Sequence, residues 1–248
     1  MGAERKLDDA TAKKLEDFRN RVAAEADDVI FRSFPTKDLI SSTSSPSSPF
    51  HISHASTASD ATVYPPPKFD STEEPDTKKR KRGLDATANG ASDTQHARYP
   101  NLVISNKALL PVQDTLKREC EHLVDLCDKV KLWINLTMPK IEDGDNFGVQ
   151  IQEEVLNELH RSQESTYNMR DSARQSHINR AKLCSKIIKY PHIEDYTLAL
   201  KEHDEKQLYL ARQHLFDLRN IYAVMTDILH KNMTKLRVPK ANNGVGLY

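Results

Sequence analysis

The chain has 248 residues, in which 36 Lys plus Arg side chains balance 36 Asp plus Glu side chains. The zero formal net charge excludes a global electrostatic attraction to nucleic acid or to a membrane surface. With 38% apolar residues and a mean hydropathy of -0.67, no stretch reaches the roughly 18 to 20 apolar residues of a membrane span, and the N-terminal residues do not read as a signal peptide. We therefore expect a soluble, intracellular protein with no membrane partner and no direct nucleic-acid partner.

Glycine and proline stand at a few positions and divide the chain into long uninterrupted runs. Only seven glycines occur, which is too few for the many turns of an ordinary sheet protein. The runs between them are much longer than an average globular helix of about 10 to 14 residues. The sequence therefore predicts an all-α fold, a bundle of four long helices. The four runs are residues 3–34, 112–138, 149–190 and 192–238.

Residues 1–34 are predicted to form the N-terminal helix of the bundle. Apolar side chains recur along this segment at spacings that place them on one face of a helix. They are sufficient for one amphipathic helix that packs on the rest of the bundle. These side chains are Leu7, Leu15, Phe18, Val22 and Val29.

Residues 35–100 differ in composition from the helical runs. Eight of the 12 prolines lie here, and residues 41–59 hold nine serines. Such a segment cannot bury enough apolar surface to offset the cost of ordering it, so we expect a disordered loop between the first two helices. It contains five consecutive basic residues, Lys78, Lys79, Arg80, Lys81 and Arg82. An accessible run of this kind fits a nuclear import receptor; the alternatives are contact with a polyanion or a solvated charged tether.

Residues 101–248 are predicted to form the remaining three helices. In the last helix, apolar residues follow alternating spacings of three and four, and a second apolar set lies on another face. This helix therefore has more apolar surface than one antiparallel neighbour would cover. In the third helix, the side chains in the middle of the stripe are small and polar, which would suit a wet or lumen-facing surface. Pro191 disfavours helical geometry at Tyr190 and predicts a tight hairpin between the last two helices.

The connection between the second and third helices combines turn-forming residues with an apolar Phe147. Asp143, Asp145 and Glu154 have the spacing of the first, third and twelfth positions of a calcium-binding loop. However, Phe147 occupies the fifth position, where an oxygen ligand is needed. The alternative is that Asp145 or Asn146 caps the third helix. We expect no metal site.

The C-terminal residues have the features of a peptide that binds in a pocket. Pro239 and two glycines end the last helix and begin a flexible tail, which finishes with Leu247 and Tyr248. Two apolar residues followed by a carboxylate fit a pocket that supplies a cation. The alternative is an ordinary frayed terminus.

Sequence signatures of catalysis are missing. The chain has no GxxxxGK[ST] phosphate cradle, no HExxH pair and no GxSxG elbow. We therefore expect no catalytic residue, no cofactor and no use of ATP. His203 and Asp204 read as part of a polar helix face. The cysteines, Cys120, Cys127 and Cys184, form no CxxC pair and are expected to be small core side chains rather than a disulfide or a zinc site.

Several of these segments together resemble the 11S proteasome activator family, also called REG, and specifically its gamma type. The activation loop of the family is matched by IEDGDNFGV at residues 141–149, and its last interhelical turn by RAKLCSKIIKYPHIEDY at residues 180–196. The gamma type is further matched by DEKQ at residues 204–207, by the last two residues and by the basic run. Cys184 departs from the pattern, which has a β-branched aliphatic residue there. Residues 35–98 carry little of the resemblance beyond KKRKR.

The resemblance implies a four-helix subunit that closes into a homoheptameric ring, docks on the outer ring of the core (20S) proteasome and opens its gate without ATP. The protein would be a non-catalytic activator of the proteasome peptidase. The surplus apolar faces support a ring independently of the resemblance, because head-to-tail contacts between identical copies would cover such faces and can close into a ring. The resemblance assigns docking to Gly246, Leu247 and Tyr248, and gate opening to Glu142, Asp143, Gly144, Asp145, Asn146, Phe147 and Gly148.

The basic run adds an expected location, the nucleus, with a possible cytoplasmic pool. It also leaves a second hypothesis open. The chain could be a nuclear coiled-coil scaffold that binds other helices, or a polyanion, through residues 78–82.

Overall fold

The computed structural model describes residues 7–37, 39, 43, 45–55, 103–140 and 147–240. Within these residues the chain is all-helical and has no strand, as predicted. Two short helical turns, Val29–Ser33 and Ile52–His54, accompany the long helices. None of the described helices is both long enough and apolar enough to cross a bilayer. The long helices are α1 (Asp9–Asp28), α3 (Leu109–Thr137), α4 (Phe147–Lys189) and α5 (Glu194–Arg237).

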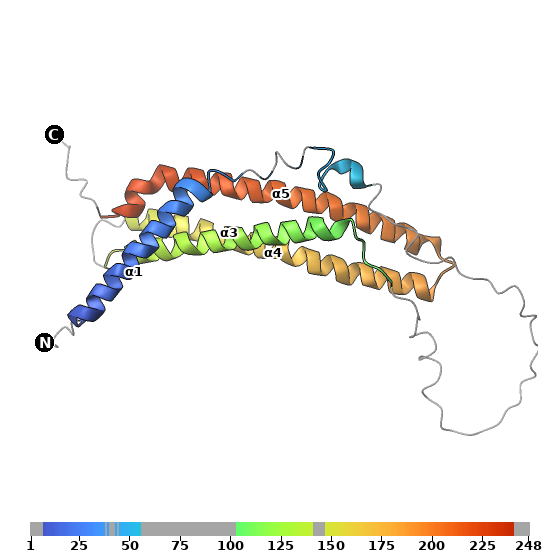
Figure 1. Ribbon diagram of the computed structural model, residues 1–248, viewed down its shortest axis with the longest axis horizontal. Coiled ribbons are helices and arrows are strands. Elements are labelled where there is room, and N and C mark those ends of the chain that lie inside the picture. Colours follow the sequence, from blue (N-terminus) through green and yellow to red (C-terminus); the bar gives the residue numbers. More distant parts are fainter. Residues whose placement is uncertain are drawn as a thin grey trace, which may run out of the picture.

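The four long helices form one elongated bundle. Figure 1 shows α3, α4 and α5 lying side by side, with α1 crossing one end of the bundle obliquely. The largest contact is between α4 and α5; α3 packs on both, and α1 packs on α3. At the end away from α1, α4 and α5 continue beyond α3 and join through the predicted hairpin, in which Pro191 lies.

α1 begins at a polar cap and continues into a wider turn. Asp8 Oδ1 accepts a hydrogen bond from the backbone N–H of Thr11 at 2.9 Å, which satisfies one of the N–H groups left unpaired at a helix start. After Asp28 the chain forms a π-helical turn, Val29–Ser33, which packs on α3 and α5 and buries Val29 and Ile30. Helical structure therefore covers residues 9–33 of the predicted N-terminal helix.

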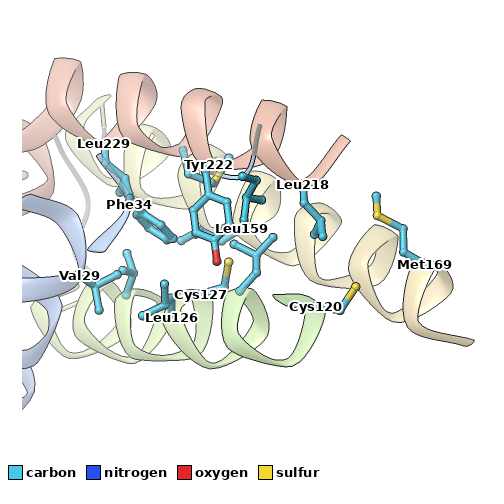
Figure 2. Packing of buried hydrophobic residues seen from close by; sticks show 14 of the residues in the cluster. Val29, Phe34, Cys120, Leu126, Cys127, Leu159, Met169, Leu218, Tyr222 and Leu229 are labelled. Carbon is cyan, nitrogen blue, oxygen red and sulfur yellow. The ribbon is translucent and has the colours of Figure 1, made fainter. Parts of the chain in front are cut away.

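An apolar core lies between the four helices (Figure 2). Tyr222 of α5 is 2% exposed, and its ring meets the ring of Phe34 edge to face with centroids 5.8 Å apart. Figure 2 shows the Tyr222 side chain reaching from α5 toward Cys127 of α3. Burying a large apolar side chain contributes about 1.5–3 kcal/mol, so this core is the main source of stability.

The cysteines occupy the core positions that the sequence indicated. Cys120 and Cys127 are buried in the main core, and Cys184 is buried in a smaller apolar cluster with Ile187 and Leu200 near the hairpin. Burial raises the pKa of the Cys120 and Cys127 thiols to about 12. Both thiols are therefore neutral at physiological pH.

The polar middle of the α4 stripe faces the bundle interior, so the expectation of a wet or lumen-facing surface is wrong. Ser162 and Thr166 are 5% and 0% exposed. Thr166 Oγ1 donates to the backbone oxygen of Ser162 at 2.7 Å, and Ser162 Oγ lies 4.0 Å from Met225 Sδ of α5. Bonds to the carbonyls of their own helix let such hydroxyls be buried.

Asp204 is also buried, so its assignment to a polar helix face is wrong. It is 1% exposed and pairs with Arg180, which comes from α4 and is 7% exposed. The sequence pattern placed Asp204 among charged residues. It does not reveal that an Arg on the neighbouring helix lies opposite.

Residues 45–55 lie within the stretch that was expected to be disordered, but the structure places them on the bundle. Phe50 is 5% exposed and belongs to the main core, and the turn Ile52–His54 packs on α5. The expectation of disorder is therefore wrong for residues 45–55. Residues 56–102 lie outside the described residues, and the division of the chain at residues 34 and 100 stays a prediction.

Candidate functional site

Most of the residues predicted to act lie outside the described part of the chain. This holds for the basic run, for the tail and for five residues of the loop. Phe147 and Gly148 are described, and they belong to the first turn of α4 rather than to a loop. The site residues outside the described ranges are Lys78, Lys79, Arg80, Lys81, Arg82, Glu142, Asp143, Gly144, Asp145, Asn146, Gly246, Leu247 and Tyr248.

The described residues that flank the loop and the tail meet at one end of the bundle. α3 ends at Thr137 before the loop, α4 begins at Phe147 after it, and α5 ends at Arg237 before the tail. Figure 1 shows these three helix ends together, at the end of the bundle that α1 crosses. Both predicted functional segments therefore leave from the same place.

Gly148 lies directly against the backbone that follows α5. A Cβ atom at Gly148 would lie 2.0 Å from the backbone oxygen of Pro239 and 2.6 Å from its Cα. Real Cβ atoms essentially never come this close to other heavy atoms. The first turn of α4 thus packs directly on the backbone that follows α5, and only glycine fits there.

Gln152 joins the same three helices through its amide group. Its side chain is 0% exposed, and Nε2 donates to the backbone oxygen of Leu236 at 3.0 Å and to Thr137 Oγ1 at 3.3 Å. The Leu236 carbonyl is one of the last four of α5, which have no partner within the helix. Thr137 Oγ1 in turn donates to the backbone oxygen of Ile134 at 2.9 Å. We call Thr137, Gly148, Gln152, Leu236 and Pro239 the loop–tail joint.

Three basic side chains of the described residues lie near the loop–tail joint. Lys240 Nζ donates to the backbone oxygen of Lys140 at 3.2 Å, so the last described residue before the tail contacts the last one before the loop. Lys235 Nζ lies 6.0 Å from the ring centroid of Phe147, a side chain that is 58% exposed. Arg237 Nη2 lies 2.9 Å from Asp27 Oδ1 of α1. Cations in the last turn of α5 also suit the negative end of the helix dipole.

The contacts of the loop–tail joint hold the helix ends from which the two segments leave. Among the described residues, no three His, Cys, Asp or Glu side chains are grouped so as to hold a metal ion. Glu154, the twelfth position of the calcium alternative, lies in α4 and accepts a hydrogen bond from Gln150 Nε2 at 3.2 Å. What the structure builds here is a common base for two peptide segments.

Comparison with known proteins identifies the family. A family model for the C-terminal part of the proteasome activator PA28 matches residues 102–246, more than half of the chain. The chain belongs to the PA28, or 11S, proteasome activator family. The resemblance read from the loop, the hairpin and the tail is thereby confirmed.

Two sets of PA28-family relatives cover the chain to different extents. Proteasome activator complex subunit 3 of Homo sapiens and that of Gallus gallus are each 35% identical to it over 252 residues, which is 98% of this chain and 98% of each relative. Proteasome activator 28 of Dictyostelium discoideum is 31% identical over 148 residues, covering 60% of this chain and 66% of that protein.

Solved structures show the same PA28 fold. The 11S subunit of the Plasmodium falciparum proteasome, PA28, superposes with a TM-score of 0.72 at 28% identity, covering 97% of this chain and 99% of that one. A chain from the archaeal 20S proteasome in complex with a mutated P26 activator gives a TM-score of 0.61 at 15% identity, over 96% and 99% of the two chains. The second likeness supports the fold alone.

Of the five residues of the loop–tail joint in this PA28-family chain, only Gly148 was among the predicted site residues. Gln152 was not singled out because it is polar, yet Gly148 and Gln152 continue the three-and-four spacing of Val155 and Leu159 toward the start of α4. Extending that stripe would have predicted that both face the core. Pro239 was read only as the residue that ends α5, and no sequence signal shows which backbone it touches.

Proposed function

We propose that this chain is a non-catalytic subunit of an ATP-independent activator of the core (20S) proteasome. Its tail, Gly246, Leu247 and Tyr248, docks on the outer ring of the core, and the segment Glu142 to Gly148, whose last two residues lie in the first turn of α4, opens the gate and so stimulates peptide hydrolysis. Family membership supports the activity. The proposal that the tail docks and the loop opens the gate is supported mainly by the contact of Gly148 with Pro239, because this contact places the starts of both segments at one point.

The proposed docking depends on several copies acting together. A short tail that inserts two apolar residues binds weakly by itself. Tails displayed on one rigid ring bind with a high effective concentration, so the affinity of the assembly exceeds that of one tail by orders of magnitude, roughly 10²–10⁴. This is why the proposed function requires an oligomer.

The proposed oligomer is a homoheptameric ring. Support comes from large apolar side chains that stay exposed on the two longest helices, including Tyr167 of α4 and Leu198, Tyr209 and Val224 of α5, whose exposed fractions are 49–56%. Faces of this kind are covered when identical copies contact one another head to tail. Light scattering should give a mass near seven times the subunit mass of 28.2 kDa.

The proposed location is the nucleus, with a possible cytoplasmic pool, reached through an import receptor that binds residues 78–82. Support comes from the five consecutive basic residues. Replacing all five by Gln should leave proteasome stimulation in vitro unchanged and shift a fluorescent fusion from the nucleus to the cytoplasm. Under the scaffold alternative, the same change would abolish binding to the partner.

A peptide-hydrolysis assay with purified core proteasome tests the activity. The wild-type protein should raise the hydrolysis of short fluorogenic peptides without ATP. Deleting Leu247 and Tyr248 should remove docking, measured by surface plasmon resonance, and with it stimulation. Replacing Asp145 and Asn146 by Ala should preserve docking and remove stimulation. Full stimulation by the Ala variant would show that the loop has no gate-opening role.

A further inference from the structure

The loop–tail joint connects the two segments more firmly than a shared starting point requires. Three helix ends converge there, and one buried side chain, Gln152, bonds to the other two helices through a single amide nitrogen. Its neighbour one turn earlier, Gly148, touches the backbone of Pro239. Rigid contacts on both turns leave the start of α4 little freedom to move relative to the end of α5.

The direction of the chain on each side makes this rigidity relevant. Val238, the C-cap residue of α5, has left the helical conformation, with φ -135° and ψ 75°, and the proline that follows disfavours helical geometry at this residue. Pro239 then fixes its own φ, so the chain leaves α5 along a defined path against Gly148. The loop enters α4 at Phe147, the residue next to Gly148. A shift of either backbone would therefore move the loop relative to the tail.

We propose that Gly148 and Gln152 are positioning residues that hold the start of α4, into which the loop leads, at a fixed place against the end of α5, from which the tail leaves, so that docking of the tails brings the loop to the gate. The inference rests on the proposed function, in which tail and loop act on the same proteasome surface. It adds to that function a mechanical coupling that neither segment provides alone. Gln152 is 0% exposed and does not touch the proteasome, whereas Gly148 is the last residue of the proposed gate-opening segment and acts in the coupling through its contact with Pro239.

Each residue contributes a different part of the coupling. Gly148 allows close contact, because any side chain at this position would push α4 away from Pro239. Gln152 fixes the register of α4 along α5, because its amide Nε2 donates to both the Leu236 carbonyl and the Thr137 hydroxyl. Alanine is a better helix former than glycine, so Gly148→Ala would favour α4 if the contact with Pro239 were absent.

The test separates docking from stimulation in the full-length assembled protein. Gly148→Ala and Gln152→Met are each compared with wild type for mass by light scattering, for binding to immobilised core proteasome, and for maximal peptide hydrolysis at saturating activator. The matched control is Gln150→Ala, which changes an exposed side chain of the same part of α4. We expect both variants to keep their mass and to bind within about twofold of wild type, and to lose at least about fivefold in maximal stimulation, whereas the control keeps all three.

The outcomes distinguish this inference from the function on which it rests. If wild type neither binds nor stimulates, the proposed function fails and the inference fails with it. If wild type stimulates and both variants stimulate equally well at saturation, the inference alone is overturned. A loss of ring mass, or a loss of binding in proportion to stimulation, would also overturn it, because the two residues would then serve folding or docking rather than the placement of the loop.

Discussion

Arg180 of α4 and Asp204 of α5 form an ion pair, with Nε 3.2 Å from Oδ1, and their side chains are only 8% and 1% exposed. Two further hydrogen bonds support the pair, although Arg180 Nη2 is buried without a hydrogen-bond partner. Asn106 Nδ2 donates to Asp204 Oδ2 at 2.8 Å, and Arg180 Nη1 donates to the backbone oxygen of Ile104 at 3.1 Å. The segment before α3 is thereby fastened to the α4–α5 hairpin, at the end of the bundle away from the loop–tail joint.

Removing one partner of this pair should be strongly destabilising. Asp204→Ala leaves the Arg180 guanidinium buried without its counter-ion, which costs about 3–5 kcal/mol in comparable cases. We expect the midpoint of urea unfolding, followed by circular dichroism, to fall accordingly. The double variant Arg180→Met and Asp204→Leu should recover most of the loss, because apolar residues of similar size replace a buried ion pair at little cost.

A surface pair provides the control for this prediction. Arg174 Nε lies 2.6 Å from Asp171 Oδ1 on the exposed face of α4. Solvent screening makes such pairs contribute little, so Asp171→Ala should not change the unfolding midpoint measurably. Equal midpoints for wild type and Asp204→Ala would contradict the importance of the buried pair.

Acidification should destabilise the bundle through buried imidazoles. Burial lowers the pKa of His214 and of His203 below the ordinary value of 6.5, and His214 Nδ1 is buried without a hydrogen-bond partner. A lowered pKa means that the folded state favours neutral imidazole. The contribution of these neutral imidazoles to the unfolding free energy is therefore present above pH 6.5 and is lost as the pH falls below it.

The variant His214→Leu tests the direction of this pH dependence. The variant cannot gain a proton, so its unfolding free energy should fall less than that of wild type between pH 7 and pH 5. Urea titrations at a series of pH values measure the difference. Parallel pH profiles for the two proteins would show that the His214 imidazole does not contribute.

The buried thiols should be unreactive until the bundle unfolds. The pKa of Cys120 and that of Cys127 are raised from 9.0 to about 12, so almost no reactive thiolate exists at pH 8. A chromogenic disulfide reagent should label neither Cys120 nor Cys127 in the folded protein and both in urea. Rapid labelling of either residue without denaturant would contradict their place in the core.

The same shift predicts a loss of stability in alkali. Because the raised pKa favours the neutral thiol in the folded state, the stabilisation is complete below pH 9 and declines as the pH rises toward 12. Burial also raises the pKa of the Tyr222 hydroxyl, which acts in the same direction. Unfolding free energies measured between pH 8 and pH 11 should therefore decrease, and Cys127→Ala should weaken that decrease.

The sequence predicted the parts of the fold that depend on spacing along one helix. Gly and Pro positions indicated the long helices, and the hairpin at Pro191 followed from the restriction that proline places on Tyr190. Contacts between helices could not be predicted in this way. Whether Asp204 points to solvent or to Arg180, and whether Gly148 meets Pro239, depends on the rotation of one helix about its axis relative to another, which a single sequence does not specify.

Residues 45–55 were misread for a different reason, and they supply a final prediction. Ordering each residue costs about 1–2 kcal/mol, and the composition rich in Ser and Pro suggested nothing to offset it. Phe50 is the exception, since it is 5% exposed and its N–H donates to Ser48 Oγ at 3.3 Å. Its burial offsets part of that cost by about 1.5–3 kcal/mol, so Phe50→Asp should release the segment from α5.

Cleavage between residues 45 and 55 by proteinase K, mapped by mass spectrometry, should then become faster. Ile52→Asp is the matched control, because Ile52 is 50% exposed and its replacement removes much less buried surface than that of Phe50, which is 5% exposed. If both variants were cut at the same rate, Phe50 would not be what holds the segment on the bundle.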